Sequence, residues 1–187
     1  MEYNKRISAL HNFYSDYLKA AFSTKDFVMR IKHNVPKQFT ERIMLSVTNV
    51  NGCKMCSYYH IEEALASGMN QREIQQLLEG GTGIPADQAV GTAFAINYAE
   101  SKGKINPVFL KRLKDTYGAK KAASIIAACR VIMVGNTLGI AVDRLKNKIS
   151  FFREFFIFLG GVVLIPAFIV SALIGLLIPL KWRFGKQ

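Results

Sequence analysis

Three reactive side chains, Cys53, Cys56 and His60, follow one another at intervals of three and four residues. Because an α-helix repeats every 3.6 residues, a helical segment would place all three on one face. Asn51-Gly52 is a turn dipeptide, so we expect a helix to begin there with Cys53 in its first turn. The unpaired N–H groups of a first turn stabilise an anion and lower the pKa of a thiol. We therefore predict a reactive pair of thiols with a histidine beside it.

A glutamate, Glu41, stands twelve residues before Cys53. The resulting pattern, Glu-x11-Cys-x2-Cys-x3-His, resembles the signature of alkylhydroperoxidase D in the carboxymuconolactone decarboxylase-like superfamily. Residues 66–74 and 106–145 also resemble segments of that family, so the resemblance covers about 35–145. It implies an all-α fold, namely a helical bundle of the alkylhydroperoxidase D-like type. It also implies self-association into a trimer or hexamer.

The activity that this resemblance implies is that of a thiol-dependent peroxidase or disulfide reductase acting on alkyl hydroperoxides or on a partner disulfide. In the family's arrangement Cys56 is the attacking thiol, Cys53 is its partner, and Glu41 with His60 forms a proton relay. The helix dipole instead favours the thiolate at Cys53, while His60 neighbours Cys56, so the order of the cysteines stays open. The implied reductant is an external dithiol, such as a peroxiredoxin or a lipoyl- or thioredoxin-type protein. Beyond the redox-active Cys53–Cys56 disulfide we expect no cofactor.

Two alternatives compete with this interpretation. One is the lactone or decarboxylase branch of the same superfamily, which works without a cysteine pair. The other is a non-enzymatic membrane module in which Cys53, Cys56 and His60 bind zinc. A structural zinc site needs four ligands. The fourth would have to come from His11, His33 or Cys129. We interpret Cys129 as a buried small hydrophobe, which is the usual state of a free cysteine.

The composition points to a membrane rather than to nucleic acid. Of the 187 residues half are apolar, and the formal net charge is +12. The 26 residues of 155–180 contain no charge and are long enough to cross a bilayer, with Trp182 as an interfacial anchor. No recognition motif accompanies the basic residues, so we expect no nucleic-acid partner. The predicted domains are a helical redox domain, 1–150, and a membrane anchor with a short basic tail, 151–187.

Hydrophobic periodicity and turn signals predict a series of helices, and no segment has the sequence pattern of a β-strand. The numbers of basic residues before and after the span are nearly equal, so the distribution of positive charge does not determine the orientation. We infer the orientation instead from the N-terminal sequence, which does not predict a signal peptide. We expect a single-pass protein of the cell membrane whose catalytic domain is cytoplasmic. Arg130 and Asn136 interrupt the apolar segment 119–148, which favours a core helix over a second span. The other expected helices are 4–22, 24–34, 37–50, 53–67, 70–78, 85–100 and 107–117.

Overall fold

Every element in the part of the chain that the structure describes is an α-helix, which confirms the predicted fold class. The computed structural model describes residues 10–80, 83–146 and 151–163, together with 166, 169, 170, 173 and 174. The helices are α1 (Leu10–Phe22), α2 (Thr24–Val28), α3 (Lys37–Asn51), α4 (Lys54–Ala66), α5 (Gln71–Gly80), α6 (Ala86–Glu100), α7 (Pro107–Lys146) and α8 (Phe151–Val163).

Local capping and turn signals explain some of these boundaries. At the start of α5, the Asn70 side chain accepts a hydrogen bond from the Glu73 N–H, and the Glu73 carboxylate accepts one from the Asn70 N–H. Gly118 has φ 73° and ψ 166°, which breaks α7 where the sequence predicts the end of a helix. The helix predicted for 24–34 is shorter than expected, because α2 ends at Val28 and turns follow it.

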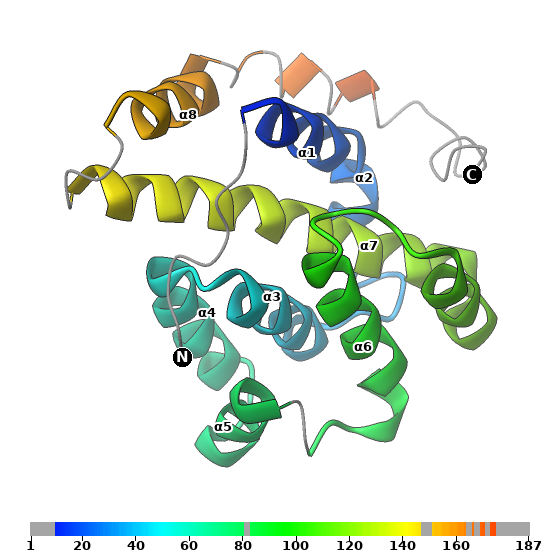
Figure 1. Cartoon of the computed structure of the whole chain (residues 1–187). Helices are drawn as coiled ribbons and strands as arrows, with labels where there is room; N and C mark the ends of the chain where they lie inside the picture. The colour runs from blue at the N-terminus through cyan, green and yellow to red at the C-terminus, as the bar shows by residue number, and fades with distance from the viewer. Residues whose placement is uncertain are drawn as a thin grey trace.

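Helix α7 forms the centre of the molecule (Figure 1). In that view α1, α2 and α8 lie on one side of α7, and α3 to α6 lie on the other. The largest core cluster joins α7 to α3 and α6 through Phe39, Phe94, Tyr98, Ile125 and Met133, all of which are buried. A second cluster joins α7 to α1 and α8. Packing on both sides therefore holds α7 in place along its second half.

Among the described residues, α7 is the one helix long and apolar enough to cross a membrane. Its most apolar stretch is nevertheless 72% buried by the surrounding helices. Arg130 donates to Ser23 Oγ at 2.8 Å, and Asn136 is fully buried. Thr48 Oγ1 donates to Asn136 Oδ1 at 3.0 Å, so neighbouring helices supply partners for part of each polar side chain. The burial agrees with the core helix predicted for this segment.

The beginning of the predicted membrane span is helix α8, and it packs against the domain. Ile157 is 2% exposed in the cluster with α1 and α7. Gly160 and Gly161 lie against Tyr14 and Leu138 so closely that a Cβ at either glycine would clash. The other apolar side chains described in α8 are exposed: Phe152, Phe155, Phe156, Phe158, Leu159, Val162 and Val163. Most of the rest of the predicted span, and Trp182, lie outside the described residues.

A buried arginine ties α3 to α5 and α6. Arg42 is 1% exposed, and its Nε donates to Gln88 Oε1 at 2.8 Å. Its guanidinium also lies 3.6 Å from the Glu73 carboxylate, which serves as the α5 cap. Because a buried charge is tolerated only when it is paired and hydrogen-bonded, the three helices must keep this arrangement.

We expect Arg42→Ala to lower the free energy of unfolding by about 3 kcal/mol, because it removes the central member of a buried polar group. Chemical denaturation of the full chain, followed by circular dichroism, measures the change. The matched control is Lys111→Ala, which removes an exposed ion pair with Asp115 and should leave stability nearly unchanged. Equal midpoints for the two variants would contradict the structural role of Arg42.

Candidate functional site

The two cysteines lie at the junction between α3 and α4. Gly52 ends α3 in the left-handed conformation, with φ 70°, and its N–H donates to the Thr48 carbonyl. Cys53 follows in an extended conformation as the N-cap of α4, and its Sγ accepts a hydrogen bond from the Cys56 N–H at 3.3 Å. The helix predicted for 53–67 is confirmed as α4, but the prediction that Asn51-Gly52 opens it is wrong. The dipeptide ends the preceding helix, and Cys53 caps the next one.

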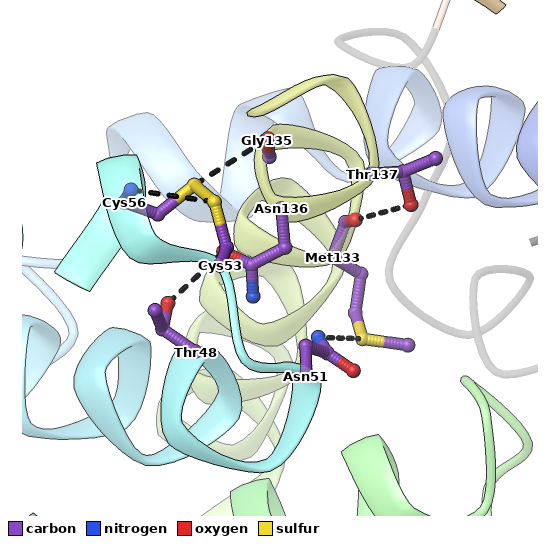
Figure 2. Close-up of a disulfide and its surroundings, with 8 residues drawn as sticks. All are labelled: Thr48, Asn51, Cys53, Cys56, Met133, Gly135, Asn136 and Thr137. Carbon is purple, nitrogen blue, oxygen red and sulfur yellow. Dashed lines mark hydrogen bonds between the residues drawn. A yellow bond between two sulfur atoms is a disulfide. The ribbon is translucent and has the colours of Figure 1, made fainter. Parts of the chain in front are cut away.

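Cys53 and Cys56 are joined by a disulfide across the first turn of α4 (Figure 2). Their Cα atoms are 5.3 Å apart, within the range that a disulfide bridges. Both residues are buried, but not equally: Cys53 is 1% exposed and Cys56 is 8% exposed. Cys56 is therefore the less buried of the two residues.

Helix α7 covers the inner side of the disulfide. Ile140 packs with both cysteines, and the Gly135 carbonyl oxygen lies 3.6 Å from Cys56 Sγ. At Gly139 the contact is closest, because a Cβ added there would lie 2.6 Å from Cys53 Sγ and 2.9 Å from Cys56 Sγ. Only glycine allows this helix to approach the sulfurs so closely. Sequence reasoning missed these glycines, although their four-residue spacing in an apolar helix was a signal.

The predicted acid and imidazole also come together. Glu41, from α3, and His60, from α4, form a contact of 2.7 Å between Oε2 and Nδ1. Both residues are buried, at 7% and 8% exposure. From the sequence pattern alone, Glu41 would be expected on the exposed face of an amphipathic helix. In the structure this helix is buried on nearly all sides. His60 lies one turn after Cys56 on α4, so the pair stands next to the disulfide along that helix.

Two apolar hollows lie beside Gly139, although neither cysteine lines them. Met55 and Gly139 line both, and the Met55 side chain is 51% exposed. One hollow, of about 320 Å³, is bordered by Lys54, Tyr58, Val142, Asp143 and Lys146. The other, of about 390 Å³, is bordered by Tyr17, Leu138, Val142, Phe158, Gly161 and Val162. A ligand can therefore reach the neighbourhood of the sulfurs from the side where α8 lies.

Cys129 and His33 do not join the site. Cys129 is a free, fully buried thiol in the core, and burial raises its pKa well above the ordinary range. His33 contacts Ser124 Oγ at 2.8 Å, far along α7 from the disulfide. Nothing is described of the His11 side chain. In the described ranges no group of three His, Cys, Asp or Glu residues is arranged to hold a metal ion.

Comparison with known proteins supports the resemblance seen in the sequence. The profile of the carboxymuconolactone decarboxylase family matches residues 15–99. The match includes Glu41, Cys53, Cys56 and His60, while the glycines of α7 that contact the disulfide lie beyond it. Searches of curated proteins and of solved structures found no match to the chain.

We expect Gly139→Ala to disfavour the disulfide, because the new Cβ would occupy the space of the two sulfurs. Equilibration of the full chain in dithiothreitol redox buffers, with the dithiol fraction measured by mass spectrometry, should show more dithiol than wild type at the same buffer ratio. Gly135→Ala is the matched control, since a Cβ there meets only Ile132 at an ordinary 3.8 Å. Wild-type behaviour in both variants would show that the close contact does not constrain the sulfurs.

Proposed function

We propose that the protein is a membrane-anchored, thiol-dependent oxidoreductase, a proposal supported by the match of residues 15–99 to the carboxymuconolactone decarboxylase family. In this proposal it reduces alkyl hydroperoxides or the disulfide of a partner protein. The observation that carries the proposal is the bonded Cys53–Cys56 pair with the buried Glu41–His60 contact one helical turn away. A disulfide within one turn of a helix can open and close with little backbone movement.

The proposed peroxide reaction has two covalent steps. A cysteine thiolate attacks the terminal oxygen of a hydroperoxide, so that the O–O bond breaks; the alcohol leaves with a proton and the sulfur becomes a sulfenic acid. The thiol of the other cysteine then attacks this sulfenic sulfur, which re-forms the disulfide and releases water. An external dithiol reduces the disulfide by thiol–disulfide exchange and is itself oxidised to a disulfide. A peroxiredoxin or a lipoyl- or thioredoxin-type protein is the proposed redox partner.

Glu41 and His60 are the proposed proton carriers for these steps. Each step moves a proton between a sulfur and an oxygen, and an imidazole suits this exchange near neutral pH. The Glu41 carboxylate, 2.7 Å from Nδ1, would hold the ring orientation and stabilise its charged form. In the order that the family resemblance implies, Cys56 attacks the peroxide, and it is the nearer of the two cysteines to His60 along α4.

The membrane location rests on the sequence and on α8. The uncharged stretch 155–180 is long enough to span, and the described part of α8 exposes a row of phenylalanine and aliphatic side chains. We propose that this segment anchors the domain to the cell membrane with the domain in the cytoplasm, and that the protein forms a homo-oligomer. The hollow bordered by Phe158 and Val162 would then face lipid.

The lactone or decarboxylase chemistry in the family's name is a second candidate. It differs in requiring no thiols, so a Cys53→Ser, Cys56→Ser double variant would keep that activity and lose peroxide reduction. Turnover of a lactone substrate by the double variant would favour the second candidate over the thiol mechanism.

We expect Cys56→Ser to abolish peroxide consumption by the purified full-length protein. Without the Cys56 thiol, neither the sulfenic acid nor the disulfide of the proposed cycle can form. Consumption of cumene hydroperoxide with dithiothreitol as reductant measures the loss. Cys129→Ser is the matched control and should retain wild-type turnover, since the Cys129 thiol is fully buried in the core. Retained activity in Cys56→Ser would remove the thiol mechanism.

Membrane anchoring predicts a preference for oxidised lipid. In liposomes that contain the full chain and a phospholipid hydroperoxide, turnover should exceed that of hydrogen peroxide at equal bulk concentration, because both reactants are confined to the bilayer. The same pair of substrates in detergent micelles provides the comparison. A preference for hydrogen peroxide in both settings would reject a lipid substrate.

A further inference from the structure

The two hollows beside Gly139 are neighbours, because Met55, Gly139 and Val142 line both of them. One lies between α4 and α7 and has a volume of about 320 Å³; the other lies between α1, α7 and α8 and has about 390 Å³. Both volumes are near the lower end of the range for ligand pockets, about 300–1,000 Å³. The half-exposed, flexible side chain of Met55 lies where the two hollows meet. We call the two hollows together the Met55 groove.

The two ends of the Met55 groove differ in chemistry. At the α4–α7 end, Lys54 and Lys146 are accompanied by one acid, Asp143, so this end has a net positive charge. At the α1–α8 end, every bordering residue except Tyr17 is apolar or glycine. A ligand that suits both ends has a long apolar chain attached to an anionic head.

The groove also has a direction relative to the proposed anchor. Helix α8 turns back over the C-terminal part of α7 (Figure 1), so that Gly161 lies against Leu138. Lys146 is the last residue of α7, shortly before α8 begins at Phe151. The positive end of the groove therefore lies near the start of the anchor, and the apolar end lies further along it. Lipids in a leaflet have the same order, with charged heads at the start of a span and acyl chains beyond.

We propose that the Met55 groove binds an anionic phospholipid of the surrounding bilayer, with its phosphate at Lys54 and Lys146 and one acyl chain in the α1–α8 hollow. The inference rests on the membrane location in the proposed function. An ammonium group attracts phosphate as a point charge. The acyl chain covers exposed apolar surface of Phe158 and Val162, which favours binding through the hydrophobic effect.

The test is photo-cross-linking of the full-length protein in phosphatidylcholine liposomes. The probe is a trace of phosphatidylglycerol with a photoreactive diazirine in its acyl chain, and peptide mass spectrometry locates the cross-links. We expect labelling at Met55 and Leu138, which lie outside the anchor. The same labelled chain on a phosphatidylcholine head should label these residues about fivefold less, because one net positive charge favours an anionic head by roughly that factor.

Substitutions at the positive end should change only the preference for the anionic head. Lys146→Gln should lower labelling by the phosphatidylglycerol probe about fivefold and leave the phosphatidylcholine probe unchanged. Asp143→Asn should act in the opposite direction and raise labelling by the phosphatidylglycerol probe. The matched control is Lys104→Gln, which also removes one exposed positive charge, but from the connection between α6 and α7, and should change neither probe.

A substitution at the junction tests the chain. Val142 lines both hollows, so Val142→Trp should fill their meeting point and abolish labelling of Met55 and Leu138 by either probe. Labelling of the anchor, which contacts lipid in any case, should stay the same. Circular dichroism shows whether this variant folds; if it does not, the variants of the exposed Lys146 and of Asp143 still decide the proposal.

Three results would overturn the proposal. Equal labelling by the two probes, or an unchanged ratio in Lys146→Gln, would reject the anionic head. Labelling confined to the anchor would reject the groove as a binding site. Displacement of the phosphatidylglycerol probe by an equal concentration of a free fatty acid would show that the groove takes a single-chain carboxylate instead.

These readouts use neither peroxide nor a thiol. Absence of peroxidase activity would therefore reject the proposed reaction and leave the lipid site standing. Flotation of the full chain with the liposomes tests the membrane location separately. A chain that does not float would reject that location, and the lipid site with it.

Discussion

The contact between α7 and the two sulfurs is the constraint on which the site depends. Because position 139 carries no side chain, the helix axis can come close enough for its backbone to form the inner wall of the disulfide. The same helix carries the Gly135 carbonyl and the buried Asn136 amide to the cysteines. One glycine thus sets the distance at which a long core helix meets the first turn of α4. This distance determines which polar groups of α7 lie beside the two sulfurs.

Because α3 is buried, its polar side chains must find partners on the neighbouring helices. Every residue of 39–48 is buried, although five of them are polar or charged: Thr40, Glu41, Arg42, Ser46 and Thr48. Each such group needs a partner in an environment that water does not reach. Arg42 finds Gln88 and Glu73, Thr48 finds Asn136, and Glu41 finds His60. The helix that supplies the acid of the proposed relay is therefore also the one that fixes α4, α5, α6 and α7 around it.

The position of α8 links the proposed anchor to the proposed chemistry. This helix packs on α1 and α7, and its Phe158 and Val162 border a hollow that reaches Gly139 and Met55. Met55 is half exposed and its thioether tip lies close to Gly139, where the sulfurs also lie. A flexible methionine can adapt to ligands of different shape. The hollow beside Gly139 therefore lies on the same face of the protein as the proposed anchor.

The sequence alone was sufficient for the features set by local chemistry. The helical class, the capping by Asn70, the break at Gly118 and the Cys-x2-Cys spacing that lets two thiols meet all follow from residues close in the chain. Glu41 was identified only through a family resemblance, since nothing local shows that its helix is buried on most sides. Gly139, Asn136 and Thr48 were not identified at all. Thr48 and Asn136 lie 88 residues apart along the chain, and only the packing of α7 against α3 and α4 brings Asn136 to Thr48 and Gly139 to the sulfurs. Spacing determined which thiols could bond, and tertiary packing decided which groups surround each of them.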